Sequence, residues 1–209
     1  MKPKTPRVAP RLFAFAALVC LFCLLAANIG NAALISFETA AAGFAEKMTS
    51  PALDAFMVSA THAGSLAAVV AVILALIIAK RTRFACGFPA AACLVASSVS
   101  NLALKNFFAR ERPGTLRLIA ASGFGFPSGH AMNNAALYAL LVLIMIRAPD
   151  GVNSPKAAVW LGTLLVFFIG ASRIYLGAHL AADVLAGWAL GAAAAFIADA
   201  LLIKFMKIS

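Results

Sequence analysis

Residues 55–79 read AFMVSATHAGSLAAVVAVILALIIA, 25 consecutive residues without a charged side chain, and the basic run KRTR follows at 80–83. A helix rises about 1.5 Å per residue, and the hydrocarbon core of a bilayer is about 30 Å thick. The stretch is therefore long enough to cross a membrane, and it ends where charge begins. This pattern recurs along the chain and predicts a membrane-embedded helical protein.

The composition excludes the other broad classes. Of 209 residues, 64% are hydrophobic and 11% charged, far from the roughly 25% charged residues of soluble domains. Intrinsic disorder is excluded by the same figures. The net charge of +10 indicates cytoplasmic loops and anionic lipid headgroups, and we expect no nucleic-acid partner. The four cysteines lie in apolar runs, so we expect neither a disulfide nor a metal site.

Uncharged stretches of this kind predict one domain, residues 1–209, with an all-α fold: a polytopic bundle of six transmembrane helices. Residues 36–54 carry several charges and are expected to form an interfacial connection. Small residues recur in the spans, which favours close helix packing. The expected spans are 12–35, 55–79, 84–104, 130–146, 157–172 and 182–203.

The distribution of Lys and Arg predicts the orientation, because cations near span ends are retained in the cytoplasm. With a cytoplasmic N-terminus, eleven of the 17 Lys and Arg residues lie on the cytoplasmic side. Three of the remaining six, Lys105, Arg112 and Arg173, belong to three polar clusters that also contain Ser, His and Asp residues, and counting the spans places all three clusters on the extracytoplasmic side. Ionisable residues are costly near hydrocarbon, so these clusters are candidate functional sites.

The residue types of the clusters indicate phosphate chemistry. Arg and Lys side chains at span ends suit a multiply charged anion, and Ser and Gly before a helix allow close backbone approach to it. His179 and Asp183 are spaced i, i+4, so the carboxylate can orient the imidazole as a nucleophile. His130 is then available as a general acid. The three clusters are Lys105 with Arg112 and Pro113; Pro127, Ser128, Gly129 and His130; and Ser172, Arg173, His179 and Asp183.

The order and spacing of these three clusters resemble the signature motifs of the type 2 phosphatidic acid phosphatase superfamily. The resemblance implies a phosphatase that needs no metal or other cofactor and forms a phosphohistidine intermediate. It implies His179 as nucleophile, Asp183 as its support and His130 as acid. The residues that it implies for binding the phosphoryl oxygens are Lys105, Arg112, Ser128, Gly129 and Arg173.

The substrate stays open at this point. We expect a lipid phosphate or diphosphate at the outer face of a bacterial inner membrane, with undecaprenyl diphosphate as the first hypothesis. Phosphatidylglycerol phosphate, phosphatidic acid and lipid A phosphate are alternatives. A protein of another class, which binds or transports phosphorylated lipid without chemistry, is the rival interpretation. The sequence does not predict the oligomeric state.

Several other polar or aromatic residues are expected to be structural. His62 has no partner nearby in sequence, and Asp199 is expected to pair with Lys204. The charged residues between and beyond the first cluster are expected to form a solvated loop face: Arg110, Glu111 and Arg117. The aromatic residues Trp160, Tyr175 and Trp188 are expected to pack or to anchor at the interface.

Overall fold

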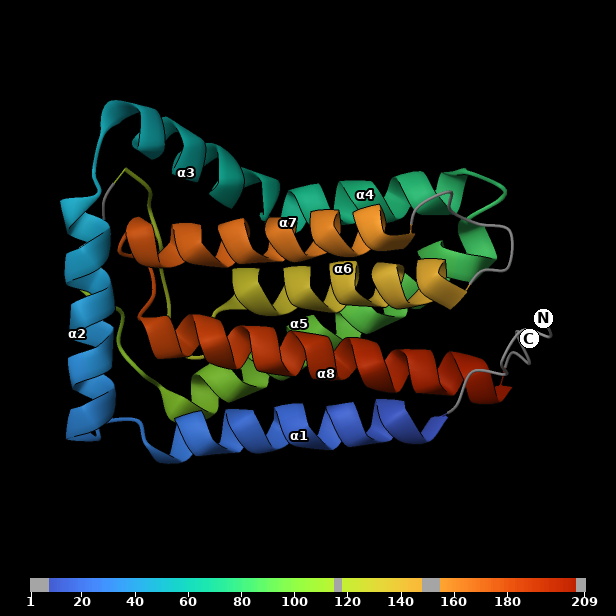
Figure 1. Cartoon of the computed structure of the whole chain (residues 1–209), viewed down its shortest axis with the longest axis horizontal. Helices are drawn as coiled ribbons and strands as arrows, with labels where there is room; N and C mark the ends of the chain where they lie inside the picture. Colours follow the sequence, from blue (N-terminus) through green and yellow to red (C-terminus); the bar gives the residue numbers. More distant parts are fainter. Residues whose placement is uncertain (1–7, 115–117, 148–154, 206–209) are drawn as a thin grey trace.

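The computed structural model describes residues 8–114, 118–147 and 155–205, and every regular element in these ranges is a helix. Figure 1 shows the long helices running side by side, with α2 lying across one end of the bundle. The predicted all-α bundle is thereby confirmed. The elements are α1 (Val8–Ala27), α2 (Ala32–Lys47), α3 (Pro51–Ala63), α4 (Leu66–Ile78), a π-helical turn (Arg83–Gly87), α5 (Phe88–Phe108), α6 (Gly129–Arg147), α7 (Pro155–Tyr175) and α8 (Ala181–Phe205).

Within the described ranges, five helical segments are long and apolar enough to cross a membrane, and α3 with α4, bent by 52° at their junction, would be a sixth if the pair is one span. The uninterrupted helix expected at 55–79 is therefore wrong, because it breaks at Gly64 and Ser65. The Ser65 hydroxyl accepts from the Ala68 N–H at 3.2 Å and opens α4. A Cβ on Gly64 would lie 2.2 Å from Cγ2 of Ile169, so a glycine at this position lets the end of α3 approach α7 closely.

The first expected span, 12–35, also needs correction. Its helix α1 ends at Ala27, and the chain turns through Gly30, whose φ of 87° suits a residue without a Cβ. Asn31 then caps α2 by accepting from the Ala33 N–H at 2.9 Å. The interfacial connection expected at 36–54 is largely this helix α2, which begins four residues earlier.

Helix α8 lies at the centre of the bundle, against α6 and α1 (Figure 1). Two glycines allow the approach to α6: a Cβ on Gly187 would lie 2.6 Å from the Ser128 carbonyl oxygen, and one on Gly191 would lie 2.1 Å from that of Met132. In lipid no hydrophobic force drives helices together, and small residues allow the close packing that stabilises their contact instead. This close contact places the start of α6 beside the start of α8.

A buried ion pair joins helices at the opposite end of the bundle, and it corrects the expected pairing of Asp199 with Lys204. Asp199 is fully buried and contacts Arg11 of α1 at 3.0 Å and Arg147 of α6 at 3.1 Å. Lys204 instead lies over the ring of Phe205. Asp199 therefore links α1, α6 and α8.

Candidate active site

The predicted site residues come from four elements that meet at the end of the bundle crossed by α2. Lys105 lies in the last turn of α5 and Arg112 in the loop that follows, while Gly129 and His130 begin α6. Arg173 lies in the last turn of α7, and Asp183 in the first turn of α8. Residues about 80 positions apart in sequence are thereby brought together, as the three motifs predicted.

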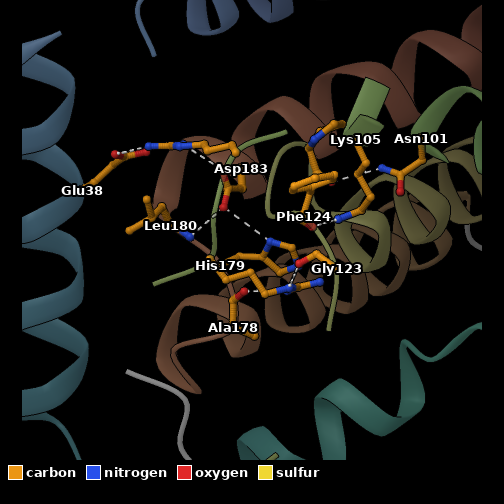
Figure 2. Close-up of polar contacts among 12 residues, drawn as sticks. Glu38, Asn101, Lys105, Gly123, Phe124, Ala178, His179, Leu180 and Asp183 are labelled. Atoms are coloured by element: carbon orange, nitrogen blue, oxygen red, sulfur yellow. Dashed lines mark hydrogen bonds and ion pairs between the residues drawn. The ribbon is translucent and has the colours of Figure 1, made fainter. Parts of the chain in front are cut away.

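The imidazole of His179 lies between Asp183 and Arg112. Figure 2 shows His179 and Asp183 facing each other. Nδ1 of His179 is 3.4 Å from Asp183 Oδ2, and its Nε2 is 3.0 Å from Nη1 of Arg112. A guanidinium can only donate, so Nε2 must be the acceptor. The ring proton of the neutral form then belongs on Nδ1, facing the carboxylate, and the lone pair of Nε2 faces the cations.

Burial and charge keep His179 neutral. Burial lowers the pKa of His179 to about 4, the positive charges of Arg112 and Arg173 act in the same direction, and Asp183 acts against them. An imidazole with this pKa carries a free lone pair throughout the neutral range. It is therefore available as a nucleophile without prior deprotonation.

The Asp183 carboxylate is fully buried and accepts from several directions. Oδ2 accepts from the Leu180 N–H at 2.9 Å, and Oδ1 accepts from Nη1 of Arg110 at 2.8 Å. The backbone carbonyl of Asp183 accepts from the Ser128 N–H at 2.9 Å. Asp183 therefore fixes the imidazole, the start of α8 and the approach to α6 at once.

Backbone oxygens hold two of the cations in place. The ammonium of Lys105 donates to the carbonyl of Phe124 (Figure 2). Arg112 donates to the Gly123 carbonyl at 2.9 Å and to the Ala178 carbonyl at 2.7 Å. These contacts fix the positions of the two positive charges, which is the preorganisation that favours binding and stabilising an anion.

Arg173 and Ser128 both keep a donor without a protein partner among the described residues. Nη1 of Arg173 donates to the Thr61 hydroxyl, but its buried Nε has no partner. The buried Ser128 Oγ also has none, so Ser128 directly precedes α6 without capping the helix through its hydroxyl. Unpaired buried donors cost free energy, and these two are free to bind an anion.

Two asparagines that the sequence motifs did not indicate, Asn134 and Asn101, lie against the start of α6. The carbonyl of His130 accepts from Nδ2 of Asn134 at 2.8 Å, and the same amide donates to the Gly64 carbonyl at 2.8 Å. A Cβ on Gly129 would lie 3.0 Å from Oδ1 of Asn101. The break between α3 and α4 thus supports the turn of α6 that carries the expected acid.

The expected solvated face is wrong for Arg110. Its side chain is 12% exposed and bridges Asp183 and Glu38, whose carboxylate lies 2.7 Å away on α2. Glu111 is exposed, as expected, and Arg117 lies outside the described residues. A single acid in the apolar part of α2 was the signal that could have revealed Glu38, since such a charge must be paired.

Two further expectations concern aromatic side chains and metals. Trp188 donates from Nε1 to the Val166 carbonyl at 3.2 Å, and the Tyr175 hydroxyl donates to Asp54 at 2.6 Å, so both pack within the bundle. Trp160 is exposed on α7.

In the part of the chain that the structure describes, no group of three or more His, Cys, Asp or Glu side chains is arranged to hold a metal ion.

Comparison with known proteins shows the family to which the chain belongs. Residues 86–206, which contain all three motifs, match the PAP2 superfamily. This chain belongs to that superfamily. A phosphatidylglycerophosphatase B of Bacillus subtilis is 30% identical over 174 residues, 81% of this chain and 85% of that protein. An undecaprenyl-diphosphatase of Sulfolobus acidocaldarius is 34% identical over 74 residues, 35% of this chain and 32% of that protein.

Solved structures show the same fold. The transmembrane PAP2-type phosphatidylglycerolphosphate phosphatase of Bacillus subtilis superposes with a TM-score of 0.85 at 27% identity, covering 92% of this chain and 98% of that one. Aquifex aeolicus LpxE superposes with a TM-score of 0.61 at 23% identity, covering 78% and 92%. This PAP2 chain is thus a multi-pass membrane protein like its bacterial relatives.

The neutral state of His179 can be measured directly. Because its pKa is lowered, the imidazolium should dominate only below about pH 4, and at pH 6 the ring should be neutral with its proton on Nδ1. Nitrogen-15 NMR of histidine-labelled protein in detergent, assigned with a His179→Asn variant, reports both properties. A ring that titrates at or above its ordinary value of about 6.5, or that carries its proton on Nε2, would contradict the assignment.

Proposed function

We propose that this PAP2 protein is a lipid phosphate phosphatase that works through a phosphohistidine on His179. The position of His179 carries the proposal: Nδ1 faces a buried carboxylate at 3.4 Å, and Nε2 faces a guanidinium at 3.0 Å. The carboxylate stabilises the positive charge that develops on the ring, while the cations attract the group to be attacked. Binding alone would be served by the cations without this pairing.

In the first step, Nε2 bonds to phosphorus and the bond from phosphorus to the leaving oxygen breaks. The incoming phosphoryl group must replace Nε2 as the partner of the Arg112 N–H. The free donors of Ser128 and Arg173 and the ammonium of Lys105 then bind the phosphoryl oxygens. His130, which must start this step protonated, gives its proton to the leaving oxygen and becomes neutral. In the second step, water donates a proton to His130 and attacks phosphorus, which releases phosphate and restores neutral His179. Neither step uses a metal ion.

An apolar hollow beside the site supports a lipid substrate. It measures about 480 Å³ and is lined by side chains of α2, α3, α7 and α8, among them Phe37, Met57, Ile174 and Ala181. Ala181 lies two residues before Asp183. A hydrocarbon chain in this hollow would place its phosphate near His179.

Among lipid phosphates, we place phosphatidylglycerol phosphate first, because the phosphatidylglycerophosphatase relative aligns with most of this chain. Undecaprenyl diphosphate, the first hypothesis from the sequence, is kept as the second candidate, since the undecaprenyl-diphosphatase match covers a shorter part. We propose that the site faces the outside of a bacterial inner membrane, with the N-terminus in the cytoplasm, because most Lys and Arg residues then lie inside.

The test of function is phosphate release by purified protein in detergent. The panel holds phosphatidylglycerol phosphate, phosphatidic acid, lipid A phosphate and undecaprenyl diphosphate. We expect release from at least one, and a His179→Ala variant should lose at least about 1,000-fold in kcat because the nucleophile is gone. The control is Lys80→Ala, at an exposed position after α4 at the other end of the bundle, which should keep wild-type activity. Binding of these lipids without any release would support the rival interpretation as a binding or transport protein.

Orientation can be tested with single cysteines in a variant whose four native cysteines are replaced by alanine. Thr49, between α2 and α3, is exposed at the site end, and Arg81, after α4, is exposed at the other end (Figure 1). In whole cells, a membrane-impermeant thiol reagent should label Thr49→Cys but not Arg81→Cys. The reverse pattern would put the site in the cytoplasm.

A further inference from the structure

A chain of buried charges leads from the catalytic carboxylate to the helix that crosses the end of the bundle. Asp183 Oδ1 accepts from Nη1 of Arg110 at 2.8 Å, and Nη2 of the same guanidinium donates to Glu38 Oε2 at 2.7 Å. Figure 2 shows the labelled Glu38 and Asp183 at the two ends of this chain, with His179 beyond Asp183. The three residues come from α2, the loop after α5, and α8.

Glu38 is the part of α2 that reaches the protein interior. Glu38 is buried, with 4% exposure, and the other described residues of α2 are not. Phe37 and Phe44 on the same helix are exposed. A buried carboxylate without a cation is strongly unfavourable, so Glu38 can be buried only because it pairs with Arg110. The same Arg110 side chain therefore both fixes α2 on the bundle and surrounds Asp183.

The net charge of Asp183, Arg110 and Glu38 affects the attack by His179. When Nε2 bonds to phosphorus, the imidazole becomes positive, and a net negative charge beside Nδ1 stabilises it. Arg110 alone would cancel the charge of Asp183. Glu38 cancels that of Arg110, so the three side chains together carry −1, while Arg110 still fixes the orientation of the carboxylate.

The other charged groups around His179 make this balance important. His179 also faces Arg112 from the loop and Arg173 from α7, and its neighbour on α6 is His130. The two arginines oppose a positive charge on the ring. Asp183, with Glu38 behind it, is what favours that charge.

We propose that Glu38 and Arg110 are positioning residues of the phosphatase, which orient Asp183 and preserve its negative charge toward His179, so that α2 is part of the catalytic unit. This inference rests on the proposed function. It predicts that the loss of Glu38 slows the chemical step and leaves substrate binding in place, since neither residue is needed to hold the phosphoryl group.

The first experiment compares Glu38→Gln with Glu46→Gln, the same change at an exposed position of the same helix. The substrate is whichever lipid phosphate the wild type hydrolyses. Glu38→Gln should lower kcat by about 10- to 100-fold with KM little changed. Losses of this size are typical in metal sites when a residue that orients a functional histidine from outside is removed. Glu46→Gln should behave as wild type. Thermal unfolding of each variant in detergent shows that the comparison is made on folded protein.

A double variant separates charge from simple docking of α2. Glu38→Gln leaves Arg110 and Asp183 with a net charge of zero. Adding Arg110→Gln to Glu38→Gln returns the group to −1, and the side-chain amide introduced by the second substitution can still donate to Asp183. The double variant should therefore be faster than Glu38→Gln alone. A role limited to holding α2 predicts that it is no faster.

Wild-type kcat in Glu38→Gln would overturn the proposal, and so would a double variant no faster than the single one. A rise of KM in Glu38→Gln with kcat unchanged would also overturn it, because that result would mean that Glu38 contributes to substrate binding. The wild type is measured in parallel on the full lipid panel. If it releases no phosphate, the proposed function itself fails, whereas an active wild type with an unaffected Glu38→Gln variant refutes this inference alone.

Discussion

A carboxylate buried at the start of α8 is the constraint on which this structure depends. Removing an unpaired carboxylate from water costs several kcal/mol, so Asp183 must be surrounded by donors. It obtains them from the Leu180 N–H of its own segment and from Arg110 of the loop after α5, and Nδ1 of His179 lies 3.4 Å from its Oδ2. Its backbone carbonyl receives the N–H of Ser128 before α6. Satisfying this one residue therefore brings together the elements that form the site.

The same principle governs the cations of this PAP2 site. Lys105 and Arg112 donate to carbonyls of the loop between α5 and α6, and Arg173 donates to Thr61 at the end of α3. Each charge is held by the fold and not by solvent, so little reorganisation is required when an anion binds. The break between α3 and α4 at Gly64 contributes as well, because it places Thr61 and the Gly64 carbonyl, which accepts from Asn134, at the level of the site.

The sequence predicts part of this arrangement well. The spans expected at 130–146, 157–172 and 182–203 agree with α6, α7 and α8 to within a few residues, because uninterrupted apolar runs end at polar or charged residues. The convergence of the three motifs was also predicted, since counting crossings places them at one end. Both inferences use local patterns, which a single sequence carries in full.

The remaining features depend on contacts between distant residues. A hydropathy pattern does not report a bend, so the break at Gly64 and the turn at Gly30 were missed. The partners of Asp199 and Arg110 lie on other helices, and the nearest cation in sequence, Lys204 in the case of Asp199, was the wrong one. An ion pair between Arg110 and Glu38, 72 residues apart, follows only from the fold.

The central claim is that His179 forms a covalent bond to phosphorus during turnover. The direct measurement is to mix enzyme with a lipid substrate carrying labelled phosphate, quench within one turnover, and locate the label on the protein by peptide mass spectrometry. We predict a label on His179 that survives alkali and is lost in acid, as a phosphorus–nitrogen bond requires, and that is absent from a His179→Ala variant. A label on another residue, or phosphate release by the wild type with no labelled protein at any quench time, would contradict the account.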